Sequence, residues 1–572
     1  MLNGDVTTAA DLPDDLTIAR AAPLQPLVDV ASRAGIDPVH LEPYGRHVAK
    51  VDLAATTVNR ATGRLVLVTA VTPTPLGEGK TTTAIGLAQG LSRLGHPATV
   101  ALRQPSLGPT FGVKGGAAGG GYSQVLPMDV MNLHLTGDMH AVTAAHNLLA
   151  AMVDNHLHHG NALGLDPRSV TWRRVLDVND RALRNIVVGL GTRGDGVPRQ
   201  SGFDITAASE VMVILALSTS LADLRGRLGR IVVGATYGGR PVTAEEIGAA
   251  GSMAVLLTEA IKPNLLQTIE HTPVLVHAGP FGNIATGHSS VVADFLGLRM
   301  GEYLVTEAGF GADMGAERFV NVACRVAGLR PAAAVVVVTV RALKVHSGRH
   351  RVVAGRPLSP ALLAEDPGDV RAGGANLLKH VQIVRDFGLP VVVAINAFAE
   401  DHASEHAVIQ ELAAEAGVPA AVCTHVAHGG EGAADLAREV VAAAAAPSDL
   451  TFTYELDAPL AAKIEAVATK VYGAEDIDLS PAAAEEILRL EAAGFGDLPV
   501  VIAKTHLSVS SDPKLKGAPR GWSLPVREVR LAAGAGYVTA ICSDMRTMPG
   551  LGVHPAAERI DIDAQGRPIG LF

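Results

Sequence analysis

The sequence predicts an α/β fold, with a P-loop-type large domain whose mainly parallel sheet is covered by helices, plus two smaller α/β domains. Short runs of β-branched and small apolar residues alternate with longer segments rich in Ala, Leu and Glu. Strands that are apolar at nearly every position are typical of parallel sheets with both faces covered. One such run is followed by a glycine-rich segment ending in Gly-Lys-Thr and then by a helical pattern, which is the setting of a P-loop.

The individual elements follow from hydrophobic periodicity and from Gly and Pro breaks. Candidate strands include Leu65–Val71, Ala98–Leu102, Ile186–Leu190, Ile231–Ala235, Val274–Ala278, Ala333–Val340, Val391–Ile395 and Val500–Ala503. Candidate helices include Thr82–Leu94, Ala208–Ser218, His406–Ala416, Asp435–Ala445, Lys463–Val471 and Pro481–Ala493.

The chain has 572 residues, enough for about three or four domains at roughly 100–200 residues each. The pattern breaks near Gly328–Pro331 and again at Pro447-Ser448-Asp449. We therefore expect a nucleotide-binding P-loop domain over residues 1–330, a second α/β domain over 331–450 and a third over 451–572.

Composition excludes several classes of protein. Apolar residues make up 48% and charged residues 18%, which argues against disorder. The net charge of −10 disfavours a nucleic-acid partner, because phosphate neutralisation needs clustered Lys and Arg. Three distant cysteines do not form a disulfide framework. Without a signal-peptide pattern or an apolar run long enough to span a membrane, we expect a cytoplasmic protein with no membrane partner.

The segment from Thr72 to Thr83 suits phosphate binding. Successive main-chain N–H groups and a helix N-terminus would face the phosphates, Lys80 would reach the β and γ oxygens, and the Thr81 hydroxyl would ligate Mg²⁺. The first glycine of the usual pattern is replaced by Thr74, and an ordinary strand–helix turn is the alternative. The candidate nucleotide-binding residues are Thr74, Pro75, Leu76, Gly77, Glu78, Gly79, Lys80, Thr81 and Thr82.

Two further polar residues follow predicted elements. Arg103 comes directly after a strand, where open α/β sheets bind their ligands, and its fork suits a phosphate or an acyl phosphate. A structural ion pair is the alternative. Asp138, in the segment from Asn132 to His140, could order an amine or a metal-bound water, or it could cap the helix that follows.

Long motifs resemble those of one family, the formate–tetrahydrofolate ligases, also called 10-formyltetrahydrofolate synthetases. The chain is similar to them from about residue 43 almost to its end, and its length suits the monofunctional form. The matching segments include Thr72–Thr82 (TPTPLGEGKTT), Arg103–Asp138, Pro198–Glu210 (PRQSGFDITAASE), Gly279–Gly287 (GPFGNIATG), Thr306–Glu317 (TEAGFGADMGAE), Ala503–Pro519 (AKTHLSVSSDPKLKGAP) and Thr547–Leu551 (TMPGL).

The resemblance implies an activity and its ligands. ATP, formate and tetrahydrofolate would give 10-formyltetrahydrofolate, ADP and phosphate through formyl phosphate. Lys80 would assist phosphoryl transfer, Arg103 would hold formyl phosphate, and Asp138 would lie near the attacking folate amine. The resemblance also implies a homotetramer activated by a monovalent cation, K⁺ or NH₄⁺, and a folate cleft completed by the second domain.

The folate pocket of the family uses aromatic rings, and here the sequence departs from the pattern. Phe398 matches one ring, and Phe310 matches a residue lining the same region. Val426 stands where a Trp is usual, and the loss of a stacked indole removes about 1 kcal/mol or more. We therefore predict weaker folate binding than is typical of the family.

Two other functions are compatible with parts of the sequence. A regulatory P-loop ATPase that binds a protein partner would turn over ATP without formate. A ligase of the same fold, suggested by Val426, would use another carboxylate or another one-carbon acceptor.

Overall fold

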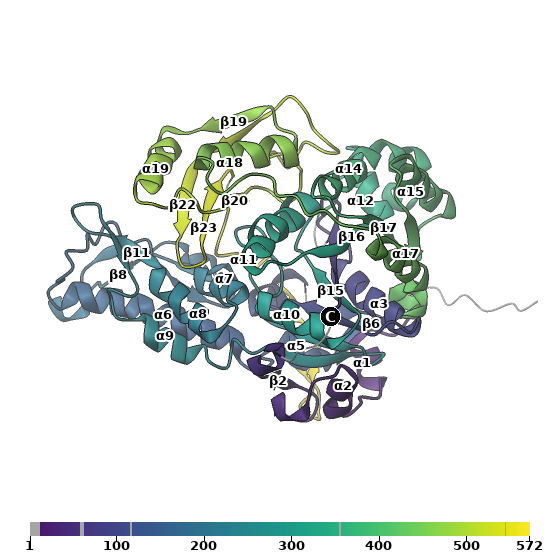
Figure 1. The fold of residues 1–572 in the computed structure, drawn as a ribbon, viewed down its shortest axis with the longest axis horizontal. Coiled ribbons are helices and arrows are strands. Elements are labelled where there is room, and N and C mark those ends of the chain that lie inside the picture. The colour runs from purple at the N-terminus through teal and green to yellow at the C-terminus, as the bar shows by residue number, and fades with distance from the viewer. Residues whose placement is uncertain (1–11, 58–61, 115–116, 354–355, 544, 572) are drawn as a thin grey trace, which may run out of the picture.

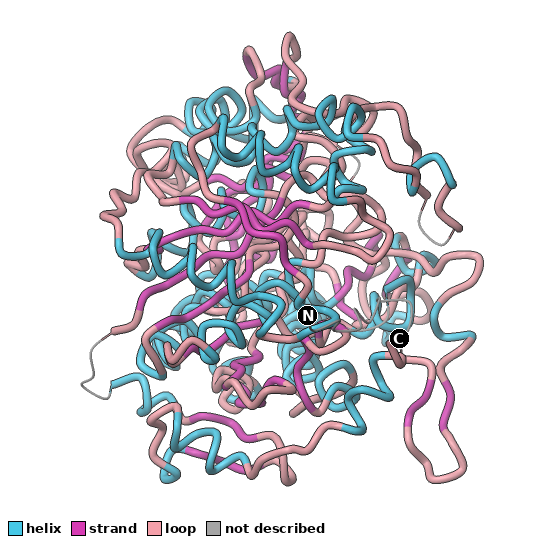
Figure 2. Tube along the Cα trace, turned by 90° about the vertical axis from the view of Figure 1, so that its right-hand side faces the viewer, coloured by secondary structure: helices cyan, strands magenta, loops and turns pink. Residues whose placement is uncertain are grey.

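The computed structural model describes residues 12–57, 62–114, 117–353, 356–543 and 545–571. Within these residues, a twelve-stranded mixed sheet forms the centre of the molecule, and helices lie on both of its sides (Figures 1 and 2). The predicted α/β class is therefore confirmed. The first eleven residues, which entered the expectation that no signal peptide is present, lie outside the described part.

Seven consecutive strands of this sheet run parallel, in the order β14-β4-β15-β3-β16-β17-β18. They are β3 (Arg64–Ala70), β4 (Ala98–Leu102), β14 (Pro273–Val276), β15 (Tyr303–Glu307), β16 (Pro331–Val338), β17 (Val391–Asn396) and β18 (Ala420–Cys423). Their apolar runs are buried on both faces, as the sequence pattern predicts for parallel strands.

Alternation along the strands divides the core into two layers. In β3, Leu65 and Leu67 point to one face, whereas Val66 and Val68 point to the other. Helices α10 (Val291–Met300), α12 (Val340–His346) and α14 (Pro367–Asp386) pack on the Leu65 face. Helices α3 (Lys80–Arg93) and α17 (Ala434–Ala445) pack on the Val66 face.

Antiparallel strands extend the sheet beyond β14. Strand β13 (Asn264–Thr268) pairs with β14, β2 (Ala49–Val51) and β6 (Ser123–Leu126), while β1 (Leu41–Pro43) and β5 (Gly119–Gly120) complete this edge. The strands predicted at Ile186 and Ile231 lie outside the large sheet. They form β8 (Ile186–Val188) and β11 (Val232–Ala235), each paired antiparallel in a two-stranded sheet, with β9 (Arg199–Ser201) and β12 (Pro241–Thr243) respectively.

The C-terminal part contributes its own small sheets, which lie together at the top of Figure 1. Strands β20 (Val500–Ala503), β23 (Tyr537–Ile541) and β22 (Glu528–Ala532) form one, and β19 (Asp476–Leu479) pairs with β21 (Ser523–Val526). Helices α18 (Leu460–Ala466) and α19 (Pro481–Ala492) accompany them.

The remaining helices connect and cover these sheets. They include α1 (Asp15–Ala21), α2 (Leu27–Arg33), α5 (Met128–Asn132), α6 (Asp138–His158), α7 (Glu210–Leu217), α8 (Leu221–Arg230), α9 (Ala250–Leu256), α15 (Ala403–Glu415) and α16 (His425–His428).

The predicted border between residues 330 and 331 falls beside a strand of the large sheet. Residues of β16 pair in parallel with β3, so strands from both sides of that border share one sheet. The division into domains over 1–330, 331–450 and 451–572 stays a prediction.

A buried carboxyl in α10 generates a prediction about stability. Asp294 is fully buried, with one carboxylate oxygen 4.0 Å from Nε2 of the buried His288. Burial raises the pKa of Asp294 from 3.8 to about 8, so folding takes up a proton between these two values. The stabilisation is fully present below the lower pKa and is lost as the pH rises through the upper one.

Asp294→Asn should therefore flatten the pH dependence of stability. Between about pH 5 and about pH 8, the melting temperature of the wild-type protein should fall more than that of the variant, which we expect to be more stable at the upper pH by about 1 kcal/mol or more. Exposed Asp435, changed to Asn, is the control. Parallel melting curves for wild type and Asp294→Asn would contradict the prediction.

Candidate functional site

The loop of residues 72–79 leaves the carboxyl end of β3 and enters α3 at Lys80. Gly79 is the residue before the helix and has φ +74°, and a Cβ there would lie 2.2 Å from Nδ2 of Asn396. That amide, at the end of β17, donates to the Glu78 carbonyl oxygen (3.1 Å). Only glycine fits a backbone that turns this way against a side chain. The strand, loop and helix thus form the local arrangement that the sequence predicts.

Glu78 closes this loop on itself. Its Oε1 accepts a hydrogen bond from the Thr74 main-chain N–H (2.7 Å), and its Oε2 accepts one from the Thr339 hydroxyl (2.7 Å). The residue is 1% exposed, so its carboxylate shapes the loop from inside. Pro75 and Leu76 are exposed at the tip, and Lys80 and Thr81 are half-buried at the start of the helix.

Glu307, the last residue of β15, links the start of α3 to Arg103. Its Oε2 accepts a hydrogen bond from the Thr81 hydroxyl (2.7 Å), and its Oε1 lies 3.4 Å from Nε of Arg103. The Glu307 side chain is only 5% exposed, whereas that of Arg103 is 27% exposed. Glu307 belongs to the segment Thr306–Glu317, but the sequence alone assigns it no role. The available signal was an acidic residue ending an otherwise apolar strand.

Asp138 begins α6 and forms a buried ion pair with Lys50 of β2. Nζ of Lys50 lies 2.6 and 2.7 Å from the two carboxylate oxygens, and Nδ2 of Asn264 donates to one of them (2.8 Å). Both charged residues are at most 5% exposed. Burial lowers the pKa of Lys50 below its usual value, and the Asp138 charge opposes that shift. Lys50 was missed by sequence analysis, because nothing near it indicates its partner.

Arg103 and Asp138 lie along one edge of the sheet. Lys50 pairs with Asn264, Asn264 with Val276, and Val276 with Leu102, the residue before Arg103. These pairs cross three strand-to-strand steps, so the Lys50 and Leu102 main chains are roughly 14 Å apart at about 4.8 Å a step. The structure thus gathers the two predicted residues at one edge but does not put them in contact.

The three predicted folate residues have different surroundings. The Phe310 ring stacks on His506, with centroids 4.6 Å apart and planes 24° apart, and Phe310 itself has φ +64°. The Arg341 guanidinium lies over the Phe398 ring at 4.0 Å. Val426 is half-buried in α16, and its carbonyl oxygen accepts a hydrogen bond from the Tyr122 N–H (2.8 Å). Phe398 and Val426 follow neighbouring strands, whereas Phe310 follows a strand three positions away.

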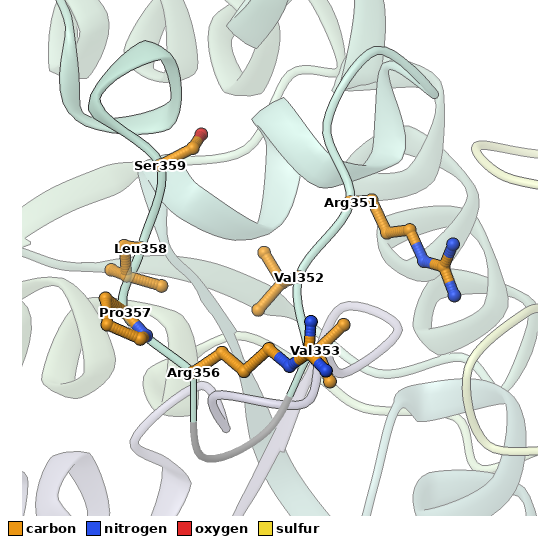
Figure 3. Close-up of a pocket in the computed structure, with 7 residues that line it drawn as sticks. All are labelled: Arg351, Val352, Val353, Arg356, Pro357, Leu358 and Ser359. Carbon is orange, nitrogen blue, oxygen red and sulfur yellow. The ribbon is translucent and has the colours of Figure 1, made fainter.

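Other surface features are separate from these residues. A cavity of about 420 Å³ is lined by residues 351–353 and 356–359, and the Arg356 side chain extends there toward Val353 (Figure 3). It contains none of the predicted site residues. In the described ranges, no helix is long and apolar enough to cross a membrane. Among the same residues, no cluster of three or more His, Cys, Asp or Glu side chains could hold a metal ion.

Glycine-rich and charged loops at the carboxyl ends of parallel strands are typical of α/β enzymes, a class that binds its ligands at this edge of the sheet. The family model "Formate--tetrahydrofolate ligase" matches residues 13–572. The chain belongs to the formate–tetrahydrofolate ligase family and is an enzyme of the ligase class.

Individual relatives agree with this assignment. The chain is 65% identical to a formate–tetrahydrofolate ligase of Cutibacterium acnes, over 98% of this chain and all of the relative. It is 64% identical to one of Saccharopolyspora erythraea with the same coverage. One of Paracoccus denitrificans is 55% identical, again over 98% of this chain and 100% of the relative.

The buried ion pair predicts that the Asp138→Asn variant loses stability as well as turnover. The Lys50 ammonium would stay buried without its counter-charge, which costs about 3–5 kcal/mol. Changing Lys50 to Met in the same chain removes that stranded charge and should restore most of the melting temperature. If Asp138 also acts on substrate, turnover stays low in the double variant.

This comparison separates the structural and the catalytic roles of Asp138. Thermal unfolding and product formation are measured for both single variants and the double variant. Recovery of turnover together with stability in the double variant would contradict a role for Asp138 in the reaction.

Val426→Trp should tighten folate binding. An indole at this half-buried position adds a surface on which a folate ring can stack. Such stacking contributes about 1 kcal/mol of binding free energy, which corresponds to a roughly fivefold lower KM for tetrahydrofolate. The KM for ATP should not change. Val426→Leu adds volume without an aromatic face and is the matched control. A folate KM equal to that of wild type, or an equal decrease in the Leu variant, would count against the prediction.

Proposed function

We propose that the chain uses ATP to join formate to tetrahydrofolate, giving 10-formyltetrahydrofolate, ADP and phosphate, and that formyl phosphate is the intermediate. The observation that carries this proposal is the double contact of Glu307 with Thr81 and Arg103. It links the residues proposed to hold the γ-phosphate with the residue proposed to hold the acyl phosphate.

The 72–79 loop would hold the phosphates of ATP. Helix α3 directs its N-terminal N–H groups and the positive end of its dipole toward this loop, which favours an anion there. The Lys80 ammonium, at the first position of the helix, would add a full positive charge. The hydrogen bonds of Glu78 with Thr74 and Thr339 keep the loop in one shape before ATP arrives, which reduces the entropy lost on binding.

The Thr81 hydroxyl and the Glu307 carboxylate fit a Mg²⁺ ion that arrives with ATP. They are two hard oxygen donors in contact with each other, and Mg²⁺ in such sites is held by one or two protein oxygens together with phosphate oxygens and water. When bound, the ion would neutralise negative charge on the phosphates. Activation by K⁺ or NH₄⁺ and assembly into a homotetramer are proposed from the family resemblance alone.

Arg103 would act on formate and on formyl phosphate. A formate oxygen attacks the γ-phosphorus and ADP leaves, which converts a poor leaving group on the formyl carbon into phosphate. Glu307 fixes the guanidinium through Nε, and the Pro280 carbonyl oxygen accepts from Nη1 (3.4 Å). A guanidinium held in one plane suits the two oxygens of a carboxylate or a phosphate.

Asp138 would orient the amine of tetrahydrofolate for the second step. The amine nitrogen attacks the formyl carbon, phosphate leaves, and the nitrogen gives up its proton. Lys50 and Asn264 fix the carboxylate in position. Phe310, Phe398 and Val426 would contact the folate rings, with Val426 giving the least contact area.

Substrate omission tests the proposal. ADP release should require formate, and the product should show the absorbance of methenyltetrahydrofolate after acidification. ADP release that ignores formate would favour a regulatory ATPase, and dependence on another carboxylate or acceptor would favour a ligase with another substrate.

Arg103→Ser should lower product formation by a factor of about 100 to 1,000, the range measured when one charge-stabilising donor is removed from an active site. ATP affinity should stay within a few-fold of wild type, because Lys80 and the loop are intact. Product formation is measured by the acidification assay and ATP affinity by direct titration. Arg438→Ser, which removes an exposed arginine ion pair in α17, is the control. Full turnover in Arg103→Ser would refute the proposed role.

A further inference from the structure

Thr72, at the start of the 72–79 loop, is held by side chains of two helices. Its N–H donates to Oδ1 of Asn376 (3.1 Å), and its carbonyl oxygen accepts from Nε2 of His346 (2.9 Å). Its hydroxyl lies 2.9 Å from Nε2 of His380 and 3.0 Å from Nδ2 of Asn376. His346 ends α12, and the other two residues lie in α14. The loop is therefore anchored from outside the sheet at its first residue.

His380 also reaches a second loop. Its Nδ1 accepts a hydrogen bond from the main-chain N–H of Ala312 (3.2 Å), two residues after Phe310. A neutral imidazole that accepts at Nδ1 carries its proton on Nε2, so His380 donates to the Thr72 hydroxyl. Burial lowers the pKa of His380 to about 4, which keeps the ring neutral near pH 7.

The backbone around His380 is shaped to fit the ring. A Cβ on Gly311 would lie 2.8 Å from Cε1 of His380, so a side chain at this position would clash with the imidazole. The same Cβ would also lie 3.2 Å from the carbonyl oxygen of Val71, the residue before Thr72. The two loops therefore meet at the buried imidazole, and a glycine allows the close approach.

We propose that His380 is a positioning residue that sets the 72–79 loop and the loop of residues 309–312 relative to each other. This inference rests on the proposed function, in which the first loop holds ATP and Phe310 contacts folate. Reaction requires the atoms of the two substrates to approach to about 3–3.5 Å, so the loops that carry them must keep a fixed spacing. A single side chain bonded to both loops provides that spacing.

Two substitutions separate the two hydrogen bonds. A glutamine amide reaches as far as Nε2 and can donate to Thr72, whereas an asparagine carbonyl reaches only as far as Nδ1 and can accept from Ala312. We expect His380→Gln to bind ATP within about twofold of wild type and tetrahydrofolate about tenfold more weakly. His380→Asn should show the opposite pattern, and kcat should fall in both.

Direct titrations with a non-hydrolysable ATP analogue and with tetrahydrofolate measure the two affinities separately. Thr72→Val removes the hydroxyl that His380 contacts, and it should weaken ATP binding like His380→Asn. Thr72→Val also removes the hydroxyl that Asn376 contacts. Adding His380→Asn to Thr72→Val should cause no further loss of ATP affinity, because Thr72→Val has already removed the hydrogen bond from His380. The matched control is His146→Gln, since His146 is another buried imidazole but bonds the Arg173 carbonyl oxygen in a different region.

The outcomes separate this inference from the proposed function. If wild type binds neither ligand, the proposed function fails. If wild type binds and turns over both substrates, three results would overturn the inference. Both His380 variants could lower the affinities for ATP and tetrahydrofolate equally, or neither variant could lower either affinity. The third such result is that His146→Gln gives the same split in affinities. A loss of melting temperature without the split in affinities also overturns it.

Discussion

Strand β15 pairs in parallel with β3 on one side and with β4 on the other. This register puts the carboxyl ends of the three strands side by side, so the residues that follow them must share one small region. Glu307 ends the middle strand and contacts Thr81 after β3 and Arg103 after β4. A shift of one residue in β15 would turn Glu307 to the other face of the sheet and break both contacts. The site therefore depends on the pairing of strands whose other residues are mostly apolar.

Buried charges are costly, and two of the buried carboxylates near the site are paired with buried lysines. Lys50 with Asp138 and Lys504 with Asp313 form ion pairs of 2.6 and 2.7 Å in which both side chains are nearly inaccessible. Such pairs add little net stability, because desolvation offsets their attraction, but removing one partner is expensive. Their effect is to hold each carboxylate in one orientation. Asp138 is held at the start of α6, and Asp313 is held next to Gly311, where His380 contacts the same loop.

The sequence predicts much of the fold and part of the site. Strands β4 and β20 occur at the predicted residues, and α3 begins within two residues of its prediction, because apolar runs and glycine breaks are local signals. No such local sequence signal marks Lys50, Glu307 or His380. Their partners are 88, 226 and 308 residues away, at Asp138, Thr81 and Thr72. Only the packed sheet brings those residues together, so no local pattern could identify them.

The order of strands also separates the residues proposed to contact folate into two groups. Reading outward from β4, the next strands are β15, β3, β16, β17 and β18, so Phe310 follows the strand beside that of Arg103. Phe398 and Val426 follow the fourth and fifth, beyond the 72–79 loop. Phe310 and Phe398 follow strands that are three steps apart, which is roughly 14 Å at about 4.8 Å per step. The spacing of the strands therefore makes Phe310 the aromatic candidate closest to the proposed formyl transfer. The hydrogen bond between His380 and Ala312 holds the loop that carries this candidate.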